Sequence, residues 1–76
     1  MFDRIVSDPA ILGGKPVVKG TRLSVGLLLE LVASGGTVAS IVEAYPHLAA
    51  EDVEQALRFA AYQIEHEVVV TTPLAA

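Results

Sequence analysis

Glycine and proline residues divide the chain into segments that differ in the structure they can form. Pro9, Pro16 and three glycines break up the first twenty residues, which makes a helix implausible there. Short extended pieces are expected instead at Arg4–Val6, Pro16–Val18 and Arg22–Leu23. The N-terminal region is therefore predicted to contribute a small β element.

The chain after this region is predicted to form three helices. The first is expected to begin after Ser24, a favourable N-cap residue, and to end at Gly35. The second begins at Thr37 and ends before Pro46, because proline cannot continue a helix. The third begins near Ala50, where acidic residues suit the positive end of the helix dipole.

These elements predict one small, mainly α domain over residues 1–76. Residues 1–23 form the extended N-terminal region, residues 24–67 the three-helix core, and residues 68–76 a tail that is β-prone because it is rich in β-branched side chains. A short helix, a tight connection and a longer helix are typical of a helix-turn-helix. The predicted fold class is therefore a homeodomain-like three-helix bundle with a small N-terminal β element.

The chain has more apolar side chains than a domain of its size can bury. Hydrophobic residues make up 53% of the sequence, and no cysteine is present to form a disulfide. A domain this small buries only about 60% of the surface that its unfolded chain exposes. Because the first helix is apolar on nearly every side, we expect a homodimer. The candidate dimer contacts are Leu27, Leu28, Leu31, Phe59 and Tyr62.

Charge is distributed unevenly along the chain. Up to Arg22 there are four basic and two acidic residues, whereas the rest contains one basic and seven acidic residues, for a net charge of −4. Clustered cations bind the phosphates of nucleic acids, although they also serve as ordinary solubilising or loop-stabilising charges. Both interpretations stay open. The candidate DNA-contacting residues are Arg4, Lys15, Lys19 and Arg22.

Carboxylates at the start of the third helix favour a different partner. In a helix-turn-helix these positions face DNA, and three carboxylates there would be repelled by its phosphates. They would suit a protein with a basic, RNA-handling surface. The β-prone tail would add a strand to such a partner's sheet. The candidate partner-facing residues are Glu51, Asp52, Glu54, Val68, Val69 and Val70.

The sequence lacks the spacings of common catalytic and metal-binding motifs. Around Lys15, a phosphate-binding loop would need glycine where Pro9 stands and a hydroxyl residue where Pro16 stands. His47 and His66 are nineteen residues apart and do not by themselves complete a metal site. We therefore expect a protein that is not an enzyme and that needs no metal or cofactor.

The N-terminus and the apolar segments bear on location. The first residues lack the basic start and apolar core of a signal peptide. No apolar run approaches the roughly 20 residues that a membrane helix requires. The absence of cysteine fits a reducing compartment, so a cytoplasmic location without membrane contact is expected.

A series of short motifs runs through the chain in a characteristic order. The motifs are Asp8-Pro9, Gly14-Lys15-Pro16, Gly20-Thr21-Arg22, Gly35, Tyr45-Pro46, Leu48 and Glu51-Asp52-Val53. From about Ile5 to Tyr62, this order resembles the domain-of-unknown-function-433 family, a large group of small prokaryotic proteins.

The resemblance implies a compact, usually dimeric, helix-turn-helix-like fold with an N-terminal β element and no established catalytic residues. It also implies partners, because many members are encoded beside a small PIN-like ribonuclease toxin and are regarded as its antitoxin. We expect an antitoxin-like protein that neutralises a cognate PIN-like ribonuclease and also binds operator DNA to regulate its own operon. The alternative is a stand-alone helix-turn-helix DNA-binding transcriptional regulator.

Overall fold

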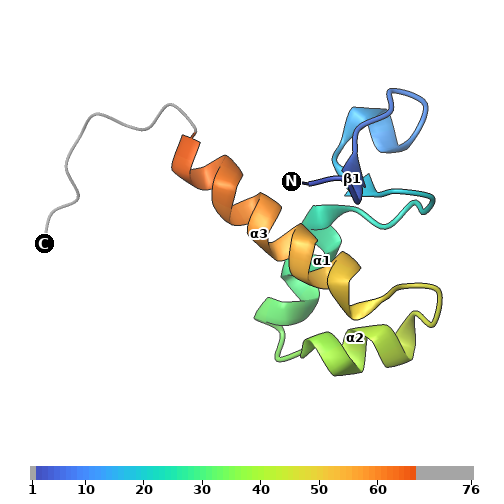
Figure 1. Cartoon of the computed structure of the whole chain (residues 1–76), viewed down its shortest axis with the longest axis vertical. Helices are drawn as coiled ribbons and strands as arrows, with labels where there is room; N and C mark the ends of the chain where they lie inside the picture. The colour runs from blue at the N-terminus through green and yellow to red at the C-terminus, as the bar shows by residue number, and fades with distance from the viewer. Residues whose placement is uncertain (1, 67–76) are drawn as a thin grey trace, which may run out of the picture.

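The structure is a computed structural model that describes residues 2–66 of the 76-residue chain. Three helices and a small two-stranded antiparallel sheet make up the fold, so the prediction of a mainly helical domain with an N-terminal β element is confirmed (Figure 1). The elements are β1 (Ile5–Val6), the 3-10 turn η1 (Leu12–Gly14), β2 (Val17–Val18), α1 (Val25–Ala33), α2 (Val38–Ala44) and α3 (Ala50–His66). The predicted tail, residues 68–76, lies outside the described residues.

The sheet consists of two very short strands. Ile5 pairs with Val18 and Val6 with Val17, in antiparallel register. An isolated bridge then joins Val17 to Ser24, one residue after the third extended piece predicted at Arg22–Leu23. Both valines of β2 are buried, so the sheet covers one end of the helical core.

The glycine-rich segment between the strands contains one turn of 3-10 helix that the sequence analysis did not predict. The Gly14 amide donates to the Ile11 carbonyl over 3.0 Å, and the Lys15 amide to the Leu12 carbonyl over 3.3 Å. Gly13 and Gly14 have φ angles of 66° and 88°, which side chains rarely adopt. The glycines therefore shape a tight turn.

The first two helices begin at the predicted caps. The Ser24 hydroxyl accepts a hydrogen bond from the Leu27 amide over 2.9 Å. At α2, Thr37 accepts from the Ser40 amide, and Ser40 accepts from the Thr37 amide, which is a capping box. After α1 the chain reverses at Gly35, whose φ of 102° suits glycine. These local signals fix the helix bounds.

The longest helix, α3, packs against both shorter helices and against β1. Its first three turns contribute to the core, whereas every residue from Ala61 to His66 is exposed. In Figure 1 the end of α3, in orange, projects away from α2. The buried apolar residues are Val17, Val18, Val25, Leu28, Ile41, Leu48, Val53, Ala56 and Ala60.

One predicted dimer contact belongs to this core. Leu28 is fully buried within its own chain, so its assignment to a dimer surface was wrong. The periodicity did not identify the inward face of α1 because nearly every side of this helix is apolar. Leu27 and Leu31 on the same helix are half-buried.

Among the helices that residues 2–66 form, none combines the length and the apolar character needed to span a membrane.

Candidate interaction surfaces

Arg4 and Asp52, which the sequence analysis placed on two different surfaces, bind each other. The Arg4 Nη1 atom donates to Asp52 Oδ1 over 2.8 Å, and Nη2 lies 3.3 Å from Glu51 Oε1. Asp52 is 8% exposed. Both assignments therefore need correction: the Arg4 guanidinium is occupied by carboxylates of its own chain, and Asp52 faces inward rather than toward a partner.

The same ion pair is part of a larger polar network, here called the N-terminal clamp (Asp3, Arg4, Asp52 and Gln55). The Arg4 amide donates to Gln55 Oε1 over 3.0 Å, and Gln55 Nε2 donates to Asp3 Oδ1 over 2.9 Å. Asp52 Oδ2 also accepts from the Ala49 amide over 2.8 Å, which satisfies a donor at the start of α3. The clamp ties the N-terminal segment to α3.

Sequence reasoning did not identify Gln55 as a member of this network. Its side chain is buried, although glutamine on a helix is usually exposed. The only signal in the sequence is that Gln55 follows Asp52 by three residues and therefore shares its helix face.

The clamp changes the pKa values of its charged members. Partial burial raises the pKa of Asp52, but the hydrogen bonds from Ala49 and Arg4 and the Arg4 charge outweigh it, so the pKa lies below its ordinary value. The hydrogen bond from Gln55 lowers the pKa of Asp3. The hydrogen bond to Asp52 raises the pKa of Arg4.

Two of the predicted carboxylates remain on the surface at the start of α3. Glu51 and Glu54 are exposed, and the Glu51 side chain keeps 60% of its accessible surface beside Arg4. They are three residues apart on a helix, so their side chains are neighbours on one face. We call this pair the acidic surface. The predicted partner-facing residues Val68, Val69 and Val70 lie outside the described residues.

Three of the four predicted DNA-contacting residues lie exposed on the loops that flank β2. Lys15 precedes this strand, and Lys19 and Arg22 follow it. Within residues 2–66, none of the three forms an ion pair with a carboxylate. We call them the basic loop cluster. The neighbouring turn is held by Thr21, whose hydroxyl donates to the Val18 carbonyl over 2.8 Å.

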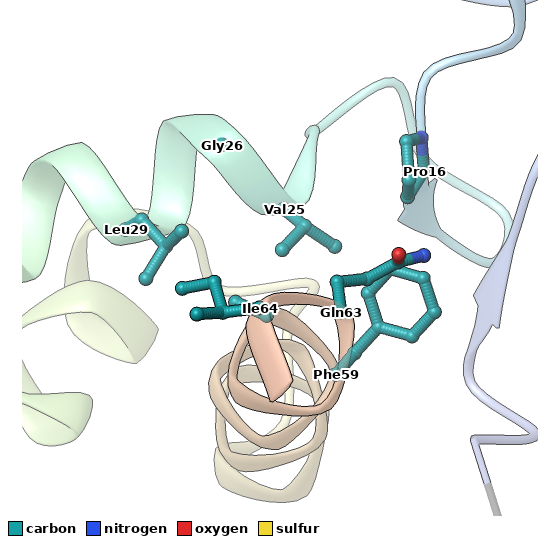
Figure 2. Close-up of a pocket in the computed structure, with 8 residues that line it drawn as sticks. Pro16, Val25, Gly26, Leu29, Phe59, Gln63 and Ile64 are labelled. Atoms are coloured by element: carbon teal, nitrogen blue, oxygen red, sulfur yellow. The ribbon is translucent and has the colours of Figure 1, made fainter. Parts of the chain in front are cut away.

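An apolar groove of about 250 Å³ lies between the start of α1 and the exposed end of α3. Figure 2 shows the Leu29 and Ile64 side chains facing each other across it, with Phe59 and Pro16 at the opposite end. Phe59 also packs edge-to-face on Phe2, with ring centroids 5.4 Å apart. The residues that line the groove are Pro16, Val25, Gly26, Leu29, Phe59, Ala60, Gln63 and Ile64.

The remaining predicted dimer contact, Tyr62, is exposed outside this groove. The centroid of its ring lies 5.6 Å from that of the Phe2 ring. The Tyr62 ring also stacks on the His66 ring, with the ring centroids 3.9 Å apart. Over the described part of the chain, no three His, Cys, Asp or Glu side chains are grouped so as to hold a metal ion.

These features define a small, mainly helical domain in which a two-stranded sheet and an N-terminal clamp are attached to the longest helix. The chain belongs to the family described as "Protein of unknown function (DUF433)", whose family model matches residues 5–60. The resemblance indicated by the sequence motifs is thus confirmed.

Two relatives illustrate this membership. The chain is 45% identical to "Uncharacterized protein y4eO" of Sinorhizobium fredii over an aligned segment of 56 residues. That segment is 74% of this chain but only 25% of that protein. The chain therefore spans about a quarter of that relative's length. Its fold is similar to the crystal structure of a DUF433 member protein from Anabaena variabilis, with a TM-score of 0.76 and 27% identity over 82% of this chain and 61% of that one.

Proposed function

We propose that the chain is an antitoxin-like, non-enzymatic binding protein that neutralises a cognate PIN-like ribonuclease. Its acidic surface, Glu51 and Glu54, would cover the basic groups with which the ribonuclease holds RNA. The observation that carries the proposal is the exposure of these two carboxylates at the start of a rigid helix. The resemblance to a family with members encoded beside such ribonucleases supports the choice of partner.

The clamp makes this surface better suited to recognition than a flexible acidic segment. Arg4 and the Ala49 amide fix Asp52 inward, which anchors the first turn of α3 and holds its neighbours outward. Side chains held on an ordered helix lose little further backbone freedom on binding. Carboxylates facing a basic surface also accelerate association and disfavour partners of like charge.

Co-purification tests the proposal. The tagged chain is expected to capture the protein encoded by the adjacent reading frame, if that frame encodes a small nuclease. The double variant Glu51→Gln/Glu54→Gln is expected to bind it about tenfold more weakly, because two complementary charges are removed. Glu65→Gln, an exposed carboxylate near the other end of α3, is the matched control and should bind normally. Failure of the wild-type proteins to co-purify contradicts the proposal.

A second candidate, the stand-alone DNA-binding regulator, is favoured by the basic loop cluster. In this proposal α2 and α3 are a helix-turn-helix, but the acidic surface keeps the start of α3 away from phosphates. Contacts to DNA would then come from Lys15, Lys19 and Arg22 on the loops. Operator DNA bound without any ribonuclease partner would favour this candidate. Either function would place the chain in the cytoplasm.

A further inference from the structure

Leu12, the first residue of η1, has a backbone conformation that is unfavourable for leucine. Its φ angle is 50°, in the left-handed region that residues with a large side chain rarely adopt. The side chain is also 41% exposed, and it is not among those that pack against the hydrophobic core. The packing of residues 2–66 therefore does not explain a large apolar side chain at this position, where glycine or asparagine would be less strained.

Hydrogen bonds nevertheless hold this turn in one conformation. The Ala10 and Ile11 amides both donate to Asp8, over 2.9 Å and 2.8 Å, and the Lys15 amide donates to the Leu12 carbonyl. In Figure 1 the turn, in light blue, lies at the edge of the molecule away from α2. Strained residues that their surroundings hold in place are typical of functional sites. Leu12 is thus presented to a partner at a fixed position.

The charges around this turn indicate the kind of partner. Lys15 follows Leu12 by three residues, and Lys19 and Arg22 lie beyond β2, so the two lysines are at most about 14 Å apart along the chain. No carboxylate of the described chain forms an ion pair with these cations. Lysine is depleted in protein–protein interfaces, whereas lysine and arginine supply the phosphate contacts of DNA-binding proteins. The surface is therefore complementary to a nucleic acid.

We propose that the η1 turn contacts duplex DNA, with Leu12 as an apolar wedge in the minor groove and the basic loop cluster on the flanking phosphates. The inference rests on the DNA-binding candidate and names the side chain that contacts the bases. Proteins that bind the minor groove combine cations with a single inserted apolar side chain in this way. Burial of Leu12 between bases would offset the strain and exposure that it has in the free chain. The acidic start of α3 takes no part.

The variant Leu12→Asn tests the wedge without disturbing the turn. Asparagine adopts positive φ more readily than leucine, so the variant is expected to be at least as stable as the wild-type chain in thermal unfolding. It is expected to bind a mixed-sequence duplex of about 20 base pairs about tenfold more weakly in fluorescence anisotropy. The salt dependence of binding should not change, because all three cations remain. Ile64→Asn, which removes another exposed apolar side chain, is the matched control and should bind normally.

DNA bending gives a second readout that a purely structural role of Leu12 would not change. A wedge kinks the duplex by about 20–90°, so the wild-type chain is expected to increase energy transfer between dyes at the two duplex ends. Saturating Leu12→Asn is expected to leave the duplex straight. A wild-type chain that binds no duplex overturns this proposal and the DNA-binding candidate together. Equal binding by both chains, or a duplex that the wild-type chain leaves straight, overturns the wedge alone, whether Leu12 then contacts an acidic protein or an anionic membrane.

Discussion

Two adjacent carboxylates at the start of α3 have different environments although they are chemically alike. Asp52 is buried and accepts hydrogen bonds from Arg4 and from the Ala49 amide. Glu51 lies beside the same guanidinium but remains exposed. The net charge of a segment therefore does not show which of its charged side chains are available to a partner, because some of them already form ion pairs or hydrogen bonds within the fold.

This difference predicts unequal costs for removing the two carboxylates. Asp52→Ala deletes a buried acceptor that serves two donors, and is expected to lower the free energy of unfolding by about 1–3 kcal/mol. Glu51→Ala deletes an exposed ion pair and is expected to cost less than about 1 kcal/mol. Urea unfolding of the two variants measures both values. Equal losses would contradict the different roles of the two carboxylates.

The same carboxyl predicts how stability changes with pH. In the folded chain the pKa of Asp52 lies below its ordinary value of 3.8. The contribution of Asp52 to the stability of the fold is therefore present above that value and disappears as the pH falls through the pKa of the folded state. The pKa of Asp3 is lowered as well, so Asp3 changes the stability of the fold with pH in the same direction. Asp52→Asn is therefore expected to lose less stability than the wild-type chain between about pH 6 and pH 3. Parallel curves would contradict a lowered pKa at Asp52.

At the scale of elements, local signals in the sequence were sufficient where local chemistry determines the structure. Ser24 and Thr37 cap the first two helices as predicted, because a cap depends on residues within one turn. The pairing of Arg4 with Asp52 was not predictable in this way, since it joins residues 48 apart in the chain. The groove was not predictable either, because it depends on how α1 crosses α3.

The connection between α1 and α2 contains a glycine whose role is steric. A Cβ atom at Gly36 would lie 2.8 Å from the Leu31 carbonyl oxygen, which cannot move without distorting α1. Gly36→Ala is therefore expected to lower the free energy of unfolding by about 1–3 kcal/mol. Ser34→Ala, an exposed change in the same connection, should alter it by less than about 0.5 kcal/mol. Thermal unfolding of the two variants gives the comparison, and equal stability would contradict the steric role.

At the scale of the whole molecule, the uneven charge of the sequence persists in the fold with one change. Arg4 leaves the basic group to join the clamp, so a single chain presents three cations in the basic loop cluster.

For the DNA-binding candidate, this predicts a specific salt dependence. Lys15→Ala/Lys19→Ala is expected to weaken operator binding. In a plot of the logarithm of the binding constant against the logarithm of the salt concentration, it is expected to reduce the size of the slope by about 0.9 for each phosphate that the variant no longer neutralises. Arg58→Ala removes an exposed cation on α3 outside the cluster and should leave the slope unchanged. Fluorescence anisotropy at several salt concentrations measures both. An unchanged slope in the double variant would mean that these lysines do not bind DNA phosphates.

The acidic surface of this chain is proposed to neutralise a ribonuclease. The most direct measurement is a titration of the adjacent-frame ribonuclease with the purified chain while RNA cleavage is followed. Wild-type chain is expected to abolish cleavage at a stoichiometric ratio, and Glu51→Gln/Glu54→Gln to require about tenfold more protein. Cleavage that continues at saturating wild-type chain would contradict the claim.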